Sequence, residues 1–333
     1  MVFMKIAVVF TRREDDSKSY EPIDWEGRDT NDDAFSVMNV LKELGHEVLQ
    51  YYVDLDLFET LRNNKKNIDM VFNLCDDGFF SDPTLEPHLP AILDILGIPY
   101  TGSGYLTLAM CLNKARAKKI LMYHKIPTPK FQVFENSKEN IKKGLRFPLI
   151  VKPVREDASI GIRDDSVVKD EKELRKKISD IIAKYKQPAL VEEFIEGREF
   201  NVGIVGNEVL PISEITFDGL PKDKPRIVNY NAKWKENTID YKETKRSCPA
   251  KIDEKLKRKL INLALKASRL MMCEDYYRVD FRVDKENNPY VLEINPNPDI
   301  SEDAGLAAMA KAKGYTYKEL IAKIIESALS RWK

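Results

Sequence analysis

The order of apolar and polar residues in the N-terminal third of the chain predicts strands that alternate with helices. Short apolar runs, typical of buried strands, occur at 5–10, 47–52, 70–74 and 98–100. Between them, apolar residues recur at helical spacing over 33–44 and 89–96. Strands and helices in alternation form a parallel sheet with helices on both faces. The pattern therefore predicts an N-terminal α/β domain, in which residues 12–30 are a polar insertion.

The remainder of the chain is richer in strands, and its pattern predicts two further domains. Strands are expected at 130–134, 149–152, 190–194, 199–205, 208–215, 277–283 and 290–294. Helices are expected at 113–125, 171–185, 254–272 and 317–332. Residues 218–248 are polar and without periodicity, and a loop of this length in a compact domain is usually functional or disordered. The domain boundaries predicted from this pattern are 1–113, 114–197 and 198–333.

Composition narrows the classes of function. The 54 Lys and Arg residues balance the 54 Asp and Glu residues, which argues against non-specific binding to nucleic acid or to an anionic membrane. The four cysteines are scattered without a CxxC pair, as is typical of a cytoplasmic protein with reduced thiols. The longest uncharged run, 95–113, is interrupted by glycines and a proline, so we expect no membrane span. The N-terminus lacks the pattern of a secretory signal.

The strongest chemical signal is a predicted hairpin near the C-terminus. Residues 277–283 alternate strictly, and Arg278 and Asp280 share the face opposite the apolar one. If the hairpin is symmetric about its turn, Asp280 faces Glu293 and Arg278 faces Asn295. Two opposed carboxylates repel each other unless a cation lies between them, and carboxylate and amide oxygens are suitable ligands for Mg²⁺. The alternative is a solvated strand face with a tolerated pair of like charges.

Two further stretches carry weaker signals. Lys152 ends a predicted strand, and the small-residue loop with Ser159 that follows is typical of a phosphate clamp. The alternative is an ordinary lysine at a strand end. The run 190–199 bends at Gly197 and could present its backbone to an adenine and Glu192 to a ribose.

These three stretches occur in the order and at the spacing of the ATP-grasp carboxylate–amine ligases, and the sequence most closely resembles the D-alanine–D-alanine ligase family. The segment 97–104 (Gly-Ile-Pro-Tyr-Thr-Gly-Ser-Gly), Lys114 and the turn 126–129 also match. The resemblance implies a three-domain ATP-grasp architecture, α/β in the N-terminal parallel-sheet domain and α+β in the C-terminal part. It also implies a two-step reaction, in which a substrate carboxylate attacks the γ-phosphate of ATP and an amine then attacks the acyl phosphate. The resemblance implies small amino acids or peptides as substrates, and a homodimer is possible.

The resemblance also implies roles for individual residues. ATP phosphates would be bound by Lys114, Lys152 and Ser159. Adenine and ribose would be held by Glu192, the backbone at Ile195, and Glu199. Two Mg²⁺ ions, or Mn²⁺ in their place, would be bound by Asp280, Glu293 and Asn295. Lys233 would reach the γ-phosphate when loop 218–248 closes, and Arg278 would stabilise the oxyanion of the tetrahedral intermediate.

The amino-acid side of the predicted site departs from the family. Where the family has Glu, Ser and Tyr in contact, this sequence has Arg28, Ala158 and Trp234. Arg28 would favour a substrate carboxylate, Trp234 could stack on a substrate or anchor the loop, and Asp299 or Asp303 could bind an amine. Ser301 is a further candidate for a substrate contact. We therefore predict a ligase for an amino-acid pair other than two D-alanines; the alternatives are an authentic D-alanine–D-alanine ligase and a non-catalytic ATP-binding module.

Overall fold

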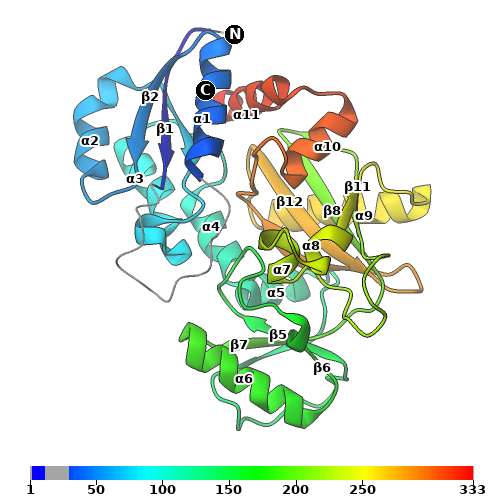
Figure 1. The fold of residues 1–333 in the computed structure, drawn as a ribbon. Coiled ribbons are helices and arrows are strands. Elements are labelled where there is room, and N and C mark those ends of the chain that lie inside the picture. Colours follow the sequence, from blue (N-terminus) through cyan, green and yellow to red (C-terminus); the bar gives the residue numbers. More distant parts are fainter. Residues whose placement is uncertain (1, 12–29, 333) are drawn as a thin grey trace.

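The computed structural model describes residues 2–11 and 30–332, with only the backbone for 30–33. Three sheets follow one another along the chain (Figure 1). Their strand orders are β2-β1-β3 in the first, β4-β7-β5-β6 in the second and β11-β10-β8-β12-β13 in the third, where β9 also pairs with β8. The strands pair in parallel in the first sheet and antiparallel in the other two, which confirms the predicted α/β and α+β parts.

The first sheet is built from the predicted apolar runs and is covered on both faces. Its strands are β1 (Lys5–Phe10), β2 (Glu47–Tyr52) and β3 (Met70–Leu74). One face packs on α1 (Thr30–Glu43), α10 (Gly305–Lys313) and α11 (Tyr317–Arg331), and the other on α2 (Leu57–Asn64) and α3 (His88–Leu96). The prediction of a fourth strand at 98–100 was wrong, because only Tyr100 forms a bridge there, to Val71. The C-terminal helices therefore share a core with the N-terminal sheet.

The second sheet carries one amphipathic helix. Its strands are β4 (Phe131–Phe134), β5 (Leu149–Pro153), β6 (Val167–Val168) and β7 (Ala189–Glu193). The helix α6 (Glu171–Tyr185) begins at Asp170, whose side chain accepts a hydrogen bond from the Glu173 backbone N–H. Its apolar face buries Leu174 and Ile178 against the sheet. Two helices, α4 (Tyr105–Leu112) and α5 (Lys114–Tyr123), connect this sheet to the first one.

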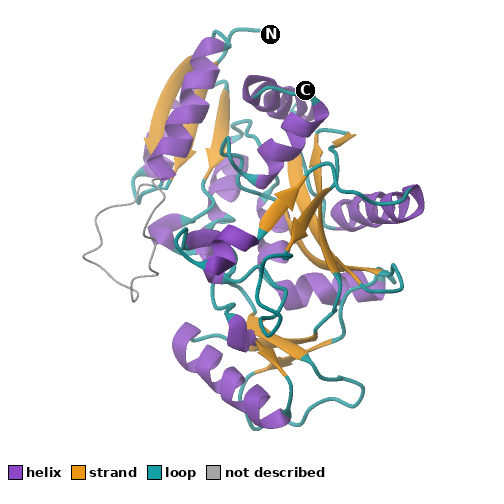
Figure 2. Ribbon diagram, turned by 45° about the vertical axis from the view of Figure 1, so that its right-hand side comes forward, coloured by secondary structure: helices purple, strands orange, loops and turns teal. Residues whose placement is uncertain are grey.

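The third sheet contains the predicted hairpin. Its strands are β8 (Arg198–Val205), β9 (Glu208–Val209), β10 (Ser213–Thr216), β11 (Lys245–Ser247), β12 (Tyr276–Val283) and β13 (Pro289–Asn295). The alternation of β12 buries Val279, Phe281 and Val283 against α9 (Glu254–Leu270). The single strand predicted at 208–215 is broken between β9 and β10, where Pro211 has no N–H to donate to a ladder. Figure 2 shows the strands of the three sheets with helices against them.

Residues 218–248 are more ordered than predicted. They contain α7 (Tyr230–Trp234), α8 (Ile239–Glu243) and β11. Both helices are too short to show a periodicity, but each has an N-cap side chain: Asn229 accepts from the Ala232 N–H and Thr238 from the Tyr241 N–H. Short 3-10 helices occur elsewhere at Lys65–Asn67, Phe79–Ser81, Pro83–Leu85 and Asp164–Ser166. None of the helices in the described ranges is long and apolar enough to cross a bilayer.

Candidate active site

The β12–β13 hairpin brings the predicted charged residues face to face. Asp280 pairs with Glu293 and Arg278 with Asn295, as predicted. Nearer the turn the register changes, and Phe281 pairs with Val291. Leu292 is therefore the extra residue of a β-bulge. The hairpin is not symmetric along its whole length, and the bulge is what places the two carboxylates opposite each other.

Asp280 is held by two side chains on the same sheet. Its Oδ1 accepts hydrogen bonds from Arg278 Nε and Asn201 Nδ2, both at 2.7 Å, and its Oδ2 accepts from Arg278 Nη2 at 2.9 Å. Burial opposes the charge of Arg278, but the Asp280 carboxylate outweighs it and raises the Arg278 pKa. Asn201, which lies opposite Asp280 on β8, was not predicted from the sequence. The available signal was a polar residue inside an otherwise apolar strand.

Lys114 lies on the other side of the hairpin, at the first position of α5. Its ammonium group is 3.7 Å from the Glu293 carboxylate and donates to the Glu156 carbonyl. The Lys114 side chain is buried, which opposes its charge, yet the nearby Glu293, Asp157 and Glu156 carboxylates raise its pKa. Lys114 is therefore a protonated, preoriented cation beside Glu293.

A second cluster of charges is buried between the second sheet and α5. The Glu192 carboxylate on β7 lies 2.8 Å from Lys152 Nζ on β5 and 2.9 Å from Lys118 Nζ on α5. Glu192 and Lys118 are each 1% exposed. Burial would raise the Glu192 pKa, but the two ammonium groups lower it. The Glu192 carboxylate acts to raise the Lys118 pKa, but burial outweighs it and lowers this pKa to about 8. Lys118 was not among the predicted site residues.

Glu199 on β8 follows the β7–β8 turn that contains Ile195. Its carboxylate is 3.4 Å from Arg282 Nε, and burial raises its pKa although Arg282 acts against this. The Arg282 guanidinium stacks on Phe194 and Phe217 and donates to the Gly197 carbonyl at 3.0 Å. Arg282 thereby fixes the turn that follows β7.

The loop after β5 is covered by the segment that includes α7. Trp234 Nε1 donates to the Ala158 carbonyl at 2.9 Å, and Ser159 Oγ donates to the Val228 carbonyl at 2.8 Å. Lys233 is exposed. Burial would raise the pKa of Asp157, but the positive charges of Lys114 and, to a smaller extent, Lys233 lower it. Two of the predicted substrate-side positions, Ala158 and Trp234, thus contact each other directly.

A small cavity of about 50 Å³ lies between the end of the first sheet and the segment after β13. Its wall includes Asp76, Tyr276, Asn297, Asp299 and Ser301. Asp299 Oδ1 accepts hydrogen bonds from both the backbone N–H and the hydroxyl of Ser301. The remaining predicted substrate residue, Arg28, lies outside the described residues.

The donor atoms beside the hairpin are suited to a hard cation. Asp280, Glu293 and Asn295 supply carboxylate and amide oxygens, which are ligands that Mg²⁺ accepts. Within residues 2–11 and 30–332 there is no cluster of three or more His, Cys, Asp or Glu residues arranged to hold a metal on its own. A cation at the hairpin would therefore take further ligands from a bound molecule or water, as Mg²⁺ usually does with phosphates.

Comparison with known proteins identifies the family. Residues 120–326 match the family described as D-ala D-ala ligase C-terminus. The D-alanine–D-alanine ligase of Aquifex aeolicus is 35% identical, with 87% of this chain and 92% of that protein covered. The chain belongs to the D-alanine–D-alanine ligase family. It is accordingly an ATP-dependent ligase that forms an amide bond, as predicted.

Other relatives and the fold agree with this family. The uncharacterized protein y4sG of Sinorhizobium fredii is also 35% identical, over 90% of this chain and 88% of its own length. The crystal structure of the Bacillus anthracis D-alanine–D-alanine ligase complexed with ATP has a TM-score of 0.74, at 24% identity and with 99% of this chain and 98% of that chain covered. The predicted ATP-grasp fold is therefore confirmed.

Proposed function

We propose that this chain uses ATP to join the carboxylate of one small amino acid or peptide to the amine of another through an acyl phosphate. The observation that carries the proposal is the convergence of Lys114, Arg278, Asp280 and Glu293 at one hairpin, beside a loop that is already covered by α7. A non-catalytic ATP-binding module has no need for a half-buried arginine in bidentate contact with the hairpin carboxylate. We therefore place the ligase ahead of the binding module.

The nucleotide would lie between the second and third sheets. Lys114, Lys152 and Ser159 would contact its phosphates, and the backbone at Ile195 would contact its adenine. Glu199 is half-buried on β8 and is our candidate for the ribose. Glu192 is 1% exposed and engaged by two lysines, so we propose that it orients Lys152 and reaches the nucleotide from the inner side. The Bacillus anthracis ligase, which has this fold, forms a complex with ATP, and this supports a nucleotide site here.

Divalent cations fit the hairpin. We propose that Asp280, Glu293 and Asn295 hold two Mg²⁺ ions, with Mn²⁺ as a substitute. Such ions offset the negative charge of the phosphate oxygens during phosphoryl transfer. Asp280 is oriented for this purpose by Arg278 and Asn201, which together donate to both of its oxygens.

The remaining roles belong to cations and to the loop. Arg278 lies next to the hairpin carboxylates and would stabilise negative charge on the reacting carboxylate oxygen. Lys233 would bind the transferring phosphoryl group from the side of α7. The contacts of Trp234 and Ser159 hold the covering segment over the phosphate loop, which would exclude water and protect an acyl phosphate from hydrolysis.

Two substrate assignments are supported by different observations. The Trp234 indole donates to the Ala158 carbonyl, so two of the positions at which this sequence departs from the family contact each other, and this favours a substrate pair other than two D-alanines. Arg28, Asp299 and Ser301 are the candidate determinants of that pair. Relatives named D-alanine–D-alanine ligase at 35% and 32% identity favour D-alanine itself. Both assignments use the same catalytic residues.

Phosphate release from Mg-ATP tests the proposal. The purified protein would be offered amino acids singly and in pairs, with D-alanine plus D-alanine as one of the pairs, and the product identified by mass spectrometry. We expect release that requires a pair and yields one dipeptide per phosphate. An Arg278→Lys variant, which retains the charge but loses the bidentate contact, should bind ATP normally and release phosphate at least a hundredfold more slowly. ATP binding without release for any pair would refute the ligase assignment.

We further propose that the three sheets mark three domains, with boundaries at 113/114 and 197/198. The strands of each sheet are contained in one of these ranges, although α10 and α11 pack against the first sheet. A homodimer and a cytoplasmic location stay predictions.

A further inference from the structure

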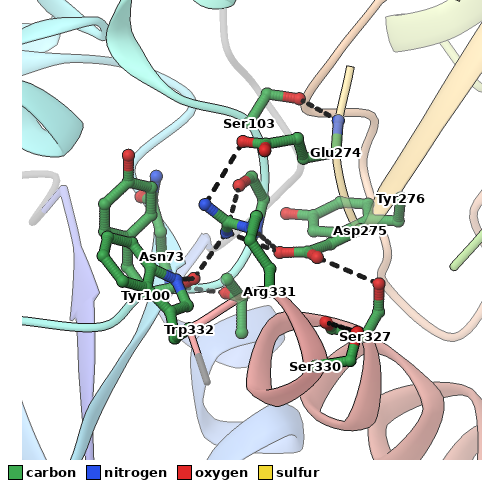
Figure 3. Close-up of polar contacts among 12 residues, drawn as sticks. Asn73, Tyr100, Ser103, Glu274, Asp275, Tyr276, Ser327, Ser330, Arg331 and Trp332 are labelled. Atoms are coloured by element: carbon green, nitrogen blue, oxygen red, sulfur yellow. Dashed lines mark hydrogen bonds and ion pairs between the residues drawn. The ribbon is translucent and has the colours of Figure 1, made fainter. Parts of the chain in front are cut away.

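The end of the C-terminal helix α11 makes an unusual concentration of polar contacts (Figure 3). Arg331 Nη2 lies 2.8 Å from the Tyr100 carbonyl, 2.9 Å from the Gly102 carbonyl and 2.8 Å from Asp275 Oδ2. Its Nη1 is 3.2 Å from the Glu274 carboxylate. One guanidinium therefore bridges a segment of the first sheet's domain and the residues that precede β12.

Aromatic rings enclose this guanidinium. It lies 5.1 Å from the ring centroids of both Tyr100 and Trp332, and Trp332 Nε1 also donates to the Tyr100 carbonyl at 3.0 Å. The Trp332 side chain packs with the core of the first sheet. From the sequence, Trp332 is expected only to pack in the core. In the structure, Arg331 and Trp332 also donate hydrogen bonds to backbone carbonyls of residues 100–102.

The same two segments are joined by further direct contacts. The Gly102 backbone N–H donates to Asp275 Oδ2 at 2.9 Å, and the Glu274 backbone N–H donates to Ser103 Oγ at 3.0 Å. Ser327, one turn before Arg331 on α11, donates to Asp275 Oδ1 at 3.0 Å. Asp275 is 5% exposed, and these donors supply hydrogen bonds to both of its buried carboxylate oxygens.

The two segments that Arg331 joins are each linked to one wall of the small cavity. On one side, Thr101 follows Tyr100 and accepts a hydrogen bond from the backbone N–H of Asn73 in β3, which leads to Asp76 in the cavity wall. On the other side, Tyr276 follows Asp275, lines the cavity and donates to Asn297 Oδ1 at 2.7 Å. Arg278 is only two residues further along β12.

We propose that Arg331 is a positioning residue that sets the spacing between the first sheet and the start of β12, and so the shape of the amino-acid site. The inference rests on the proposed function, because it assumes that the cavity between these walls belongs to the site for the amino substrates. The nucleotide residues Lys114, Lys152 and Glu192 lie on other elements, α5, β5 and β7. Loss of Arg331 should therefore affect the amino substrates and leave the nucleotide site unchanged.

A purely structural role would have a different signature. A partly buried, multiply paired arginine is a weak source of stability by itself, since its desolvation opposes its ion pairs. If Arg331 only stabilised the fold, its loss would lower the unfolding temperature and the active fraction, while KM of the remaining folded protein stayed unchanged. A misplaced wall instead changes KM, because small displacements of binding groups have large effects on substrate positioning.

The experiment compares Arg331→Met and Arg331→Lys in the full chain. We expect Arg331→Met to raise KM for the amino substrates at least tenfold, while the Kd of ADP, measured by titration calorimetry, changes less than twofold. Arg331→Lys, which keeps one charge-assisted bond to Asp275, should recover part of the loss. Lys323→Met is the matched control, since Lys323 is on the same helix but pairs with Glu208 inside the third sheet's domain; it should leave KM unchanged.

Hydrogen exchange separates this inference from the proposed function. The backbone amides of Gly102 and Glu274 should exchange at least tenfold faster in Arg331→Met, whereas those of β5 and β7 should not. If the wild-type protein releases no phosphate with any substrate pair, the proposed function fails and exchange alone decides whether Arg331 joins the two segments. Unchanged exchange at Gly102 and Glu274, or an equal rise of KM in Lys323→Met, would overturn the inference.

Discussion

Replacing Glu192 by glutamine removes the carboxylate that lies between two buried lysines. Lys118 and Lys152, at 2.9 and 2.8 Å from its oxygens, are 1% and 8% exposed. The variant keeps the shape and the hydrogen-bonding capacity of the side chain. It leaves two ammonium groups in a site that excludes water, and each opposes the charge of the other.

The expected cost follows from burial. Removing one partner of a buried ion pair typically costs about 3–5 kcal/mol, because the other charge is left without compensation. Here two charges lose the same partner, so we expect the upper part of that range at pH 7. The neighbouring Glu193 offers a matched control: its partners Lys130 and Arg146 are 60% and 80% exposed, at 3.9 and 3.5 Å. Glu193→Gln should cost only about 0–1 kcal/mol.

The pH dependence distinguishes this cause from general damage. In the wild type the Lys118 pKa is about 8 in the folded state, below its ordinary value of 10.5. Between these two values the unfolded chain binds more protons than the folded chain, so folding is favoured as the pH rises through this window. Without Glu192 the pKa of Lys118 in the folded state falls further. The pH range in which folding is favoured by rising pH then begins below pH 8. The destabilisation by Glu192→Gln should therefore shrink by at least about 1 kcal/mol between pH 7 and pH 9.5.

Native-state hydrogen exchange of the β5 and β7 amides is the appropriate assay, because a chain with three sheets need not unfold in one step. The opening free energy of these strands would be compared for wild type, Glu192→Gln and Glu193→Gln at both pH values. A loss below about 1 kcal/mol for Glu192→Gln at pH 7, or an equal loss at both pH values, would refute the reasoning.

Three further predictions concern the loop, the turn and the hairpin. Trp234→Phe retains the ring but loses the hydrogen bond to Ala158, worth about 1 kcal/mol, so KM for the amino substrates should rise roughly fivefold in the phosphate-release assay; an unchanged KM would contradict the role of this contact. Gly197→Ala places a Cβ 2.0 Å from the Val283 carbonyl at a φ of +151°, and thermal unfolding should show a loss of at least about 2 kcal/mol. Asp280→Asn should raise the Mg²⁺ concentration for half-maximal activity at least tenfold, and an unaltered Mg²⁺ titration would exclude Asp280 as a ligand.

The part of the site that could be predicted from the sequence is the part that depends on local periodicity. The alternation of β12 identifies the polar face with Arg278 and Asp280, because a strand has a period of two whatever it packs against. The pairing of Asp280 with Glu293 was predicted by assuming that the hairpin is symmetric about its turn. Because of the bulge at Leu292, that symmetry holds only at the end of the hairpin away from the turn. The length of loop 218–248 predicts a functional segment, but its two five-residue helices carry no periodicity to detect.

The residues that were missed act across long sequence separations. Asn201 is 79 positions from Asp280 and Arg331 is 231 positions from Tyr100, so no local pattern couples them. Arg331 in particular reads as an ordinary basic residue in the last turn of a helix, where a positive charge is favoured by the helix dipole alone. Its position becomes informative only when α11 is placed against the first sheet, since the fold then brings the chain's last helical residue onto the start of β12. Arg331 thereby joins two segments that are each linked to one wall of the proposed amino-acid site, and this is why we expect its replacement to alter substrate binding more than nucleotide binding.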